Sequence, residues 1–175
     1  LFSVLSPNID QNNQYTSSPI IGFSQVKDTA TVNEYLRLEK VQEIFSDNLK
    51  FMWGHKARKV EYDDGSTRTL IDLYAIKTSR NDDEAILDGS VITNARRDVN
   101  EYGENYVSMS MNSEGAKTWE KVTGDNVGNH IAIVVDERIV SAPVIRSKIA
   151  GGNTSIEGGF TLEEAGDLAS MLRIG

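Results

Sequence analysis

The stretch from Ile131 to Ala142 reads Ile-Ala-Ile-Val-Val-Asp-Glu-Arg-Ile-Val-Ser-Ala and decides the fold class. Its two apolar runs are rich in β-branched residues and flank the polar pair Asp136-Glu137, a pattern typical of two strands joined by a tight turn. We therefore expect a hairpin with strands over 131–135 and 138–142. The first run is the longest strongly apolar one, and it is far shorter than the roughly 20 residues that a membrane-spanning helix needs.

Regular strand and helix patterns surround this hairpin. Residues 106–111 alternate polar with apolar side chains, which predicts a half-buried strand with Met109 and Met111 in the core. A helix is expected from Ser113 to Gly124, and a short strand over 154–156 follows the hairpin.

The last helix has the clearest start signal in the chain. Thr161 and Glu164 stand at the spacing of a capping box, in which the hydroxyl and the carboxylate each accept a hydrogen bond from a backbone N–H. Its buried face is expected to comprise Leu162, Ala165, Leu168, Ala169 and Leu172.

The order strand–helix–strand–strand–strand–helix predicts an α+β fold rich in antiparallel pairing. We expect helices packed on one face of the sheets and a ferredoxin-like character in the C-terminal half. The charged run at 81–84 predicts a boundary between a variable, head-like subdomain over residues 1–80 and a second subdomain over 81–175.

The N-terminal half is expected to hold one long helix followed by a hairpin. Thr31 and Glu34 stand at capping-box spacing, so we expect a helix from about 32 to 48. Arms at 59–62 and 67–78, with a turn at 63–66, form the predicted hairpin. The apolar stripe of the helix, expected to face the core, comprises Val32, Tyr35, Leu36, Leu38, Val41, Ile44, Phe45 and Leu49.

The composition favours one or two globular domains and argues against several functions. The 175 residues are 39% hydrophobic and 25% charged, with 18 Lys and Arg against 26 Asp and Glu, for a net charge of −8. Nucleic acid would be repelled by such a chain, and the one short basic run, 56–59, is interpreted as a solvated strand or turn. Because cysteine is absent, disulfides, thiolate metal sites and cysteine nucleophiles are excluded.

No motif predicts catalysis, a metal or a cofactor. His55 and His130 are the only histidines and stand far apart. A calcium-loop pattern beginning at Asp98 lacks two of its oxygen ligands. The glycine pairs 151–152 and 158–159 lack the spacing of a phosphate-binding loop, and no nucleophile elbow is present. We therefore expect no enzymatic activity.

Several blocks of the second half occur in a specific order: Ser141-Ala-Pro-Val-Ile145, Phe160-Thr-Leu-Glu-Glu-Ala165 and Leu172-Arg-Ile-Gly175, preceded by Leu87-Asp-Gly89 and Asn112-Ser-Glu-Gly-Ala116. This order resembles the end of the first periplasmic region of the SecD family of protein-export membrane proteins, which are often fused to SecF as SecDF. The resemblance covers about residues 87–175. In the family a transmembrane helix follows this point, so we expect apolar spans after Gly175 and before Leu1.

The resemblance implies a periplasmic domain of a bacterial inner-membrane protein that assists the Sec translocase. Family members use the proton-motive force to help complete protein export. The implied partners are unfolded exported polypeptide, contacted directly, and SecF and the SecYEG channel, reached through the membrane part. The alternative is a soluble α+β enzyme or small-ligand-binding domain.

A sequence-independent grip on polypeptide suits an exposed strand edge or an apolar groove. Phe51, Met52 and Trp53 form a dense apolar triplet and are our candidates for lining a groove, although they could instead close the core of their own subdomain. The family usually has Asp-Gly where this chain has Asp136-Glu137, so we expect a wider or different turn here, because Glu resists positive φ.

Overall fold

The computed structural model describes residues 2–4, 8–9, 15–16, 20–45, 49–77 and 85–174. In chain order the elements are β1 (Phe2–Val4), β2 (Asn8–Ile9), β3 (Tyr15–Thr16), β4 (Ile20–Gln25), η1 (Val26–Asp28), α1 (Thr29–Leu36), α2 (Glu39–Gln42), β5 (Leu49–Glu61), β6 (Thr67–Lys77), η2 (Gly89–Val91), β7 (Ile92–Val99), β8 (Asn105–Met111), α3 (Ser113–Asp125), β9 (Ile131–Val135), β10 (Arg138–Ser141), β11 (Asn153–Phe160) and α4 (Leu162–Ile174).

Two sheets organise the chain. The first has strand order β1-β9-β10-β5-β6-β4, the second has the order β11-β8-β7, and β2 pairs with β3. Among the described strands, all pairs are antiparallel except β10 with β5, which are parallel and meet at Ile139 and Gly54. The predicted α+β class with antiparallel-rich sheets is confirmed. The first sheet joins strands from both sides of residue 80, and the expected boundary at 81–84 lies outside the described residues.

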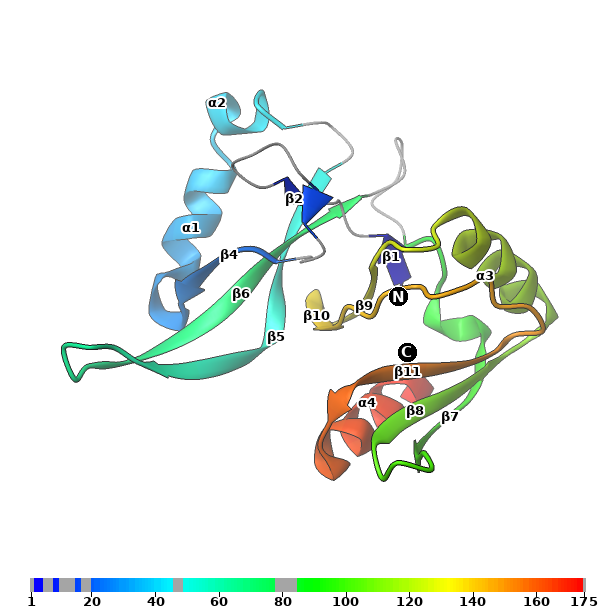
Figure 1. Cartoon of the computed structure of the whole chain (residues 1–175). Coiled ribbons are helices and arrows are strands. Elements are labelled where there is room, and N and C mark those ends of the chain that lie inside the picture. The colour runs from blue at the N-terminus through cyan, green and yellow to red at the C-terminus, as the bar shows by residue number, and fades with distance from the viewer. Residues whose placement is uncertain are drawn as a thin grey trace.

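Two regions meet along β9 and β10. We call residues 20–77, with β4 to β6, α1 and α2, the hairpin region, and residues 85–174 the C-terminal body (Figure 1). Because side chains alternate along a strand, β9 serves both regions. Ile131 and Ile133 belong to the core of the body, whereas Ala132 and Val134 pack in a second cluster with Ile76 of β6.

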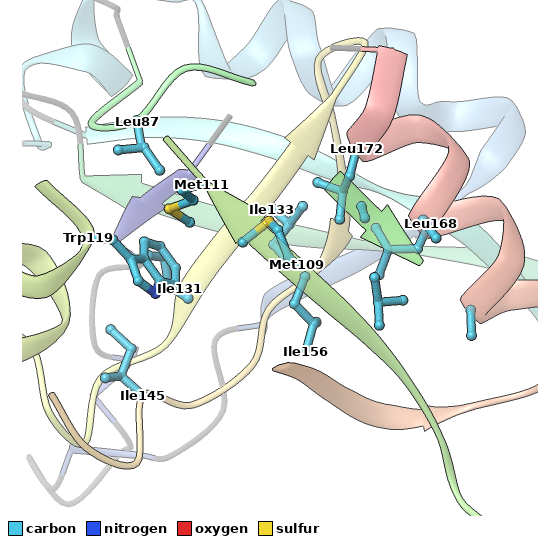
Figure 2. Packing of buried hydrophobic residues seen from close by; sticks show 14 residues of the cluster. Leu87, Met109, Met111, Trp119, Ile131, Ile133, Ile145, Ile156, Leu168 and Leu172 are labelled. Carbon is cyan, nitrogen blue, oxygen red and sulfur yellow. The ribbon is translucent and has the colours of Figure 1, made fainter. Parts of the chain in front are cut away.

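The core of the body confirms the predicted strand and helix faces. Figure 2 shows Met109 and Met111 of β8 among side chains of α3, β9 and α4. The capping box of α4 is formed: the N–H of Thr161 donates to the Glu164 carboxylate at 2.8 Å, and the N–H of Glu164 donates to the Thr161 hydroxyl at 3.2 Å. Leu162 was expected on the buried face, but it is 54% exposed, because the first turn lies outside the core cluster.

The turn between β9 and β10 is tighter than expected. Arg138 pairs with Val135, so only Asp136 and Glu137 form the turn, with φ values of 48° and 58°. Two positive φ values are the requirement of a two-residue type I′ turn. The expectation of a wider or different turn is therefore wrong. Burial of the flanking strands holds this register against a cost of about 1–2 kcal/mol for a side chain in the left-handed region.

The single long helix expected over 32–48 is also wrong, although its last three positions, 46–48, lie outside the described residues. The chain forms two short helices, with Leu38 in an extended conformation between them. The side-chain amide of Gln42 donates to the carbonyl of Leu36, which supplies a partner for the end of α1. Because α1 already begins at Thr29, Thr31 lies inside the helix and the expected capping box is not formed.

The apolar stripe of these helices is only partly used. Val32 and Leu36 pack against the small cluster around Trp53, but Tyr35, Leu38 and Ile44 are more than half exposed. The predicted hairpin is confirmed, with a first strand that begins earlier, at Leu49.

Candidate functional site

A groove of about 400 Å³ with an apolar floor and a polar rim lies between β11 and the segment 143–149. We call it the β11 groove. Its buried lining comes from α3, β9 and the two walls and comprises Trp119, Ile131, Ile133, Ile145 and Ile156 (Figure 2). Its volume lies within the range of about 300–1,000 Å³ that is usual for ligand sites.

One wall of the groove is the edge of a sheet. β11 is the outer strand of the order β11-β8-β7. The N–H of Met111 donates to the carbonyl of Gly152 at 2.8 Å. This bond shows which residue pairs between β8 and β11 are hydrogen-bonded. Because bonded pairs alternate in an antiparallel ladder, Thr154 also bonds to β8, while the N–H and C=O groups of Asn153 and Ser155 point away from it.

The opposite wall is held by backbone hydrogen bonds to the start of β9. Ile131 donates to the carbonyl of Pro143 and Ile145 donates to that of Asn129, both at 2.9 Å. Within the described ranges no backbone hydrogen bond joins this wall to Asn153 or Ser155. The groove thus separates β11 from a connecting segment, and each of the two is fixed to a different sheet.

Glycine allows β11 to start close to α3. Gly151 and Gly152 have φ values of 80° and 71°, a region that side chains rarely adopt. A Cβ on Gly152 would lie 2.6 Å from the Cβ of Ala116, whereas nothing lies within 4 Å of a Cβ on Gly151. Gly152 therefore permits both the turn and the close packing that place the groove wall.

One ion pair spans the rim of the groove. The guanidinium of Arg146 lies 3.6 Å from the carboxylate of Glu157, on the opposite wall, and both side chains are more than half exposed. Lys148 pairs with Glu120 at 2.7 Å. Exposed pairs contribute only about 0–1 kcal/mol, so the Arg146–Glu157 pair opposes entry of a ligand only weakly.

The predicted triplet lies on β5, where alternation divides its side chains. Trp53 is buried under α1, and its indole N–H donates to the Asn33 side chain at 2.8 Å. Phe51 packs on the same side, edge-to-face with Phe45. Met52 packs against the second cluster, around Ile76. All three line a more open hollow of about 710 Å³, so their role in binding stays a prediction.

An ion pair joins the hairpin region to the body. The ammonium of Lys56 on β5 contacts the carboxylate of Glu164 on α4. The hydrogen bond from Lys56, followed by that from the Thr161 N–H, lowers the pKa of Glu164 below its ordinary value. The basic run 56–59 is thus a solvated strand, as interpreted.

Two further findings concern only the described ranges. They contain no group of three or more His, Cys, Asp or Glu side chains placed to hold a metal ion. None of their helices combines the length and the apolar character needed to cross a membrane.

Comparison with known families decides where this chain belongs. The family model described as SecDF, P1 head subdomain, matches residues 69–175. The chain belongs to the SecD/SecDF family. The predicted resemblance to the first periplasmic region of SecD is confirmed.

Curated SecD proteins and solved SecDF structures agree with this assignment. The chain is 38% identical over 156 residues to the protein translocase subunit SecD of Rhodothermus marinus, covering 89% of this chain and 24% of the relative. It is 43% identical over 90 residues to SecDF of Thermus thermophilus, covering 51% of this chain and 12% of the relative. A crystal structure of SecDF in a super-membrane-facing form matches 99% of this chain and 18% of its own, with a TM-score of 0.52 and 26% identity. The chain thus spans about a quarter or less of these relatives.

The SecD signature includes one wall of the β11 groove. Pro143, Val144 and Ile145 of the Ser-Ala-Pro-Val-Ile block line it. Sequence reasoning used this block to recognise the family and did not identify it as a site. The signal that could have identified this wall is that the Pro-Val-Ile part of the block is apolar yet does not continue the preceding strand, β10.

Proposed function

We propose that this domain engages unfolded polypeptide as the extracytoplasmic part of a membrane protein that assists the Sec translocase. The exported chain is the direct partner, and SecF and the SecYEG channel are reached through the membrane part, which couples export to the proton-motive force. The domain does this without catalysis or a cofactor. The observation that carries the proposal is a SecD signature block that lines an apolar groove.

The geometry of the groove supports binding of many different sequences. The buried part of its lining is apolar, with polar groups at the rim, and burial of apolar surface contributes about 25 cal/mol per Å² whatever the identity of the side chain. Both walls are fixed by hydrogen bonds, so little ordering is needed on binding. The hollow beside Phe51 and Met52 is a second candidate surface, more open and more polar at its rim.

The connection between the two regions supports a change in their relative orientation. Besides the small buried cluster around Ile76, the regions are joined by one residue pair of β10 and β5, Ile139 with Gly54, and by the exposed Lys56–Glu164 ion pair. A polypeptide that binds one orientation more tightly shifts the equilibrium toward it by that difference in affinity. Movement of the membrane part would use this difference to hold and release substrate.

Site-specific photo-crosslinking in the intact membrane protein tests the proposal. A photoreactive residue replaces Val144, which is 43% exposed on the groove wall, in cells that carry a stalled export intermediate. The control position is Tyr102, which is 80% exposed in the β7–β8 turn, and Phe51 reports on the second surface. We expect crosslinks to the intermediate from Val144 and none from Tyr102. Absence of crosslinks from both Val144 and Phe51 would refute the proposed function.

A further inference from the structure

We propose that the β11 groove takes an extended, apolar stretch of polypeptide as an added β-strand on the free edge of β11. This inference rests on the proposed function, because the added strand is a segment of the exported chain. It concerns how that chain is held, through pairing of backbones in addition to burial of side chains.

The backbone of β11 provides the first argument. The N–H and C=O groups of Asn153 and Ser155 point away from β8, and in the described ranges no backbone partner lies on that side. An extended peptide carries complementary groups at the same spacing, since alternate residues of a strand present both groups to one neighbour. These bonds involve backbone only, so they suit a partner of any sequence.

Over residues 153–156 the edge lacks proline and charge, two of the devices that block pairing, although a bulge and the charged Glu157 follow this stretch. Proteins protect exposed edges with proline, charged side chains or very short strands. Residues 153–156 contain no proline and no charge, and the first charged residue of the strand is Glu157. The ladder from Asn153 to Ile156 is regular, with the irregularity only after it.

The lining of the groove defines the side chains of the bound segment. Residues of the added strand would alternate between the apolar lining, formed around Trp119, Ile131 and Ile145, and the solvent-facing side that carries Ser155. A segment with apolar residues at every second position fits this arrangement.

Charge complementarity favours a neutral or basic segment. The rim cation Arg146 is already paired with Glu157, so it offers no free positive charge to the ligand. The whole chain carries a net charge of −8, which repels an acidic segment. We therefore expect acidic peptides to bind more weakly than basic ones.

Backbone methylation of a peptide probe tests this mode of binding on the unaltered chain. The probe is acetyl-Lys-Val-Thr-Val-Thr-Val-Lys-amide, compared by titration calorimetry with two forms N-methylated at the Thr or at the Val residues. Only one of these sets of amides can face β11, so one form should lose about tenfold or more in affinity while the other binds like the parent peptide. A loss of affinity on methylation of the Thr residues indicates an antiparallel added strand. A loss of affinity on methylation of the Val residues indicates a parallel added strand. Equal affinities of the two methylated forms, or no binding of the parent peptide, would overturn the inference.

A variant of the protein, in place of a modified peptide, tests the same edge. Ser155→Pro removes an N–H that points away from β8, so the ladder to β8 stays intact, and we expect about tenfold weaker binding. Ser155→Ala keeps the N–H and should bind normally. If Ser155→Pro fails to fold, the methylated peptides still test the added strand on the unaltered chain.

Light scattering tests whether a second copy of this chain, instead of a peptide, occupies the edge of β11. A dimer that Ser155→Pro converts to a monomer, together with no peptide binding, would overturn the inference in favour of self-pairing. Crosslinking at Val144 in cells combined with no effect of methylation would leave the proposed function standing and remove only the added strand.

Discussion

The C-terminal body and the hairpin region share β9, yet they are stabilised differently. The body contains one cluster of 14 buried residues drawn from both of its long helices and from β7, β8, β9 and β11. The hairpin region has its own cluster of only three buried residues and shares a second cluster of four with β9 and β10, and large side chains such as Phe23, Tyr35 and Ile44 remain exposed there. The proposed groove therefore lies on the better packed region, where its walls are fixed before a ligand arrives.

The largest expected effect separates the two regions by leucine truncation. Leu168→Ala removes a side chain that is 1% exposed in the body, and we expect it to lower the free energy of unfolding by about 4 kcal/mol. Leu38→Ala, at a site 51% exposed in the hairpin region, should change it by less than about 1 kcal/mol. Urea denaturation measures both changes in the free energy of unfolding. Similar losses in the two variants would show that the two regions are equally well packed.

A glycine pair tests how tightly β11 packs on α3. Gly152→Ala brings a Cβ against Ala116 and keeps φ at 71°, so we expect a loss of about 3 kcal/mol. Gly151→Ala meets no neighbour within 4 Å and should cost only the conformational strain, about 1 kcal/mol. Equal destabilisation of the two variants would show that β11 is less closely packed than described.

The turn shared by the two regions offers a stabilising change. Glu137→Gly relieves a φ of 58° and should raise the free energy of unfolding by about 1 kcal/mol. Glu137→Ala removes the same carboxylate but keeps a Cβ in the left-handed region, and it should leave stability nearly unchanged. A gain of the same size from both variants would assign the effect to charge instead of backbone strain.

The smallest expected effect concerns the ion pair between the regions. The pKa of Glu164 is lowered in the folded chain, so its contribution is present above the ordinary value of 4.5 and is lost as pH falls through the lowered pKa. Glu164→Gln should reduce stability by less than about 1 kcal/mol at neutral pH, and the difference from the unaltered chain should vanish in acid. Glu163→Gln, in the same helical turn, controls for charge. A difference that does not change with pH would exclude the ionic contribution.

The two regions also differed in how far their structure could be predicted from sequence. Alternation along 106–111 and the Thr161–Glu164 capping box are local signals, and both describe the structure correctly. The stripe over 32–48 has helical spacing too, but spacing cannot show whether a partner surface exists along its length, and here Tyr35, Leu38 and Ile44 remain more than half exposed.

The candidate site was the least predictable feature. The β11 groove combines Trp119, Pro143 and Ser155, which come from a helix, a connecting segment and a strand, and no local pattern shows that they meet. Phe51, Met52 and Trp53 were predicted to line a groove because they are adjacent in sequence. Because side chains alternate along β5, the three residues pack in two different clusters.

Amide hydrogen exchange, followed by NMR with and without the Lys-Val-Thr-Val-Thr-Val-Lys peptide, tests most directly whether the body holds the polypeptide. We predict that the peptide slows exchange at Asn153 and Ser155, whose N–H groups are open along the edge of β11, and leaves the rates at Phe51 to Trp53 unchanged. Protection confined to Phe51–Trp53, or peptide binding with no slowing along β11, would contradict the account.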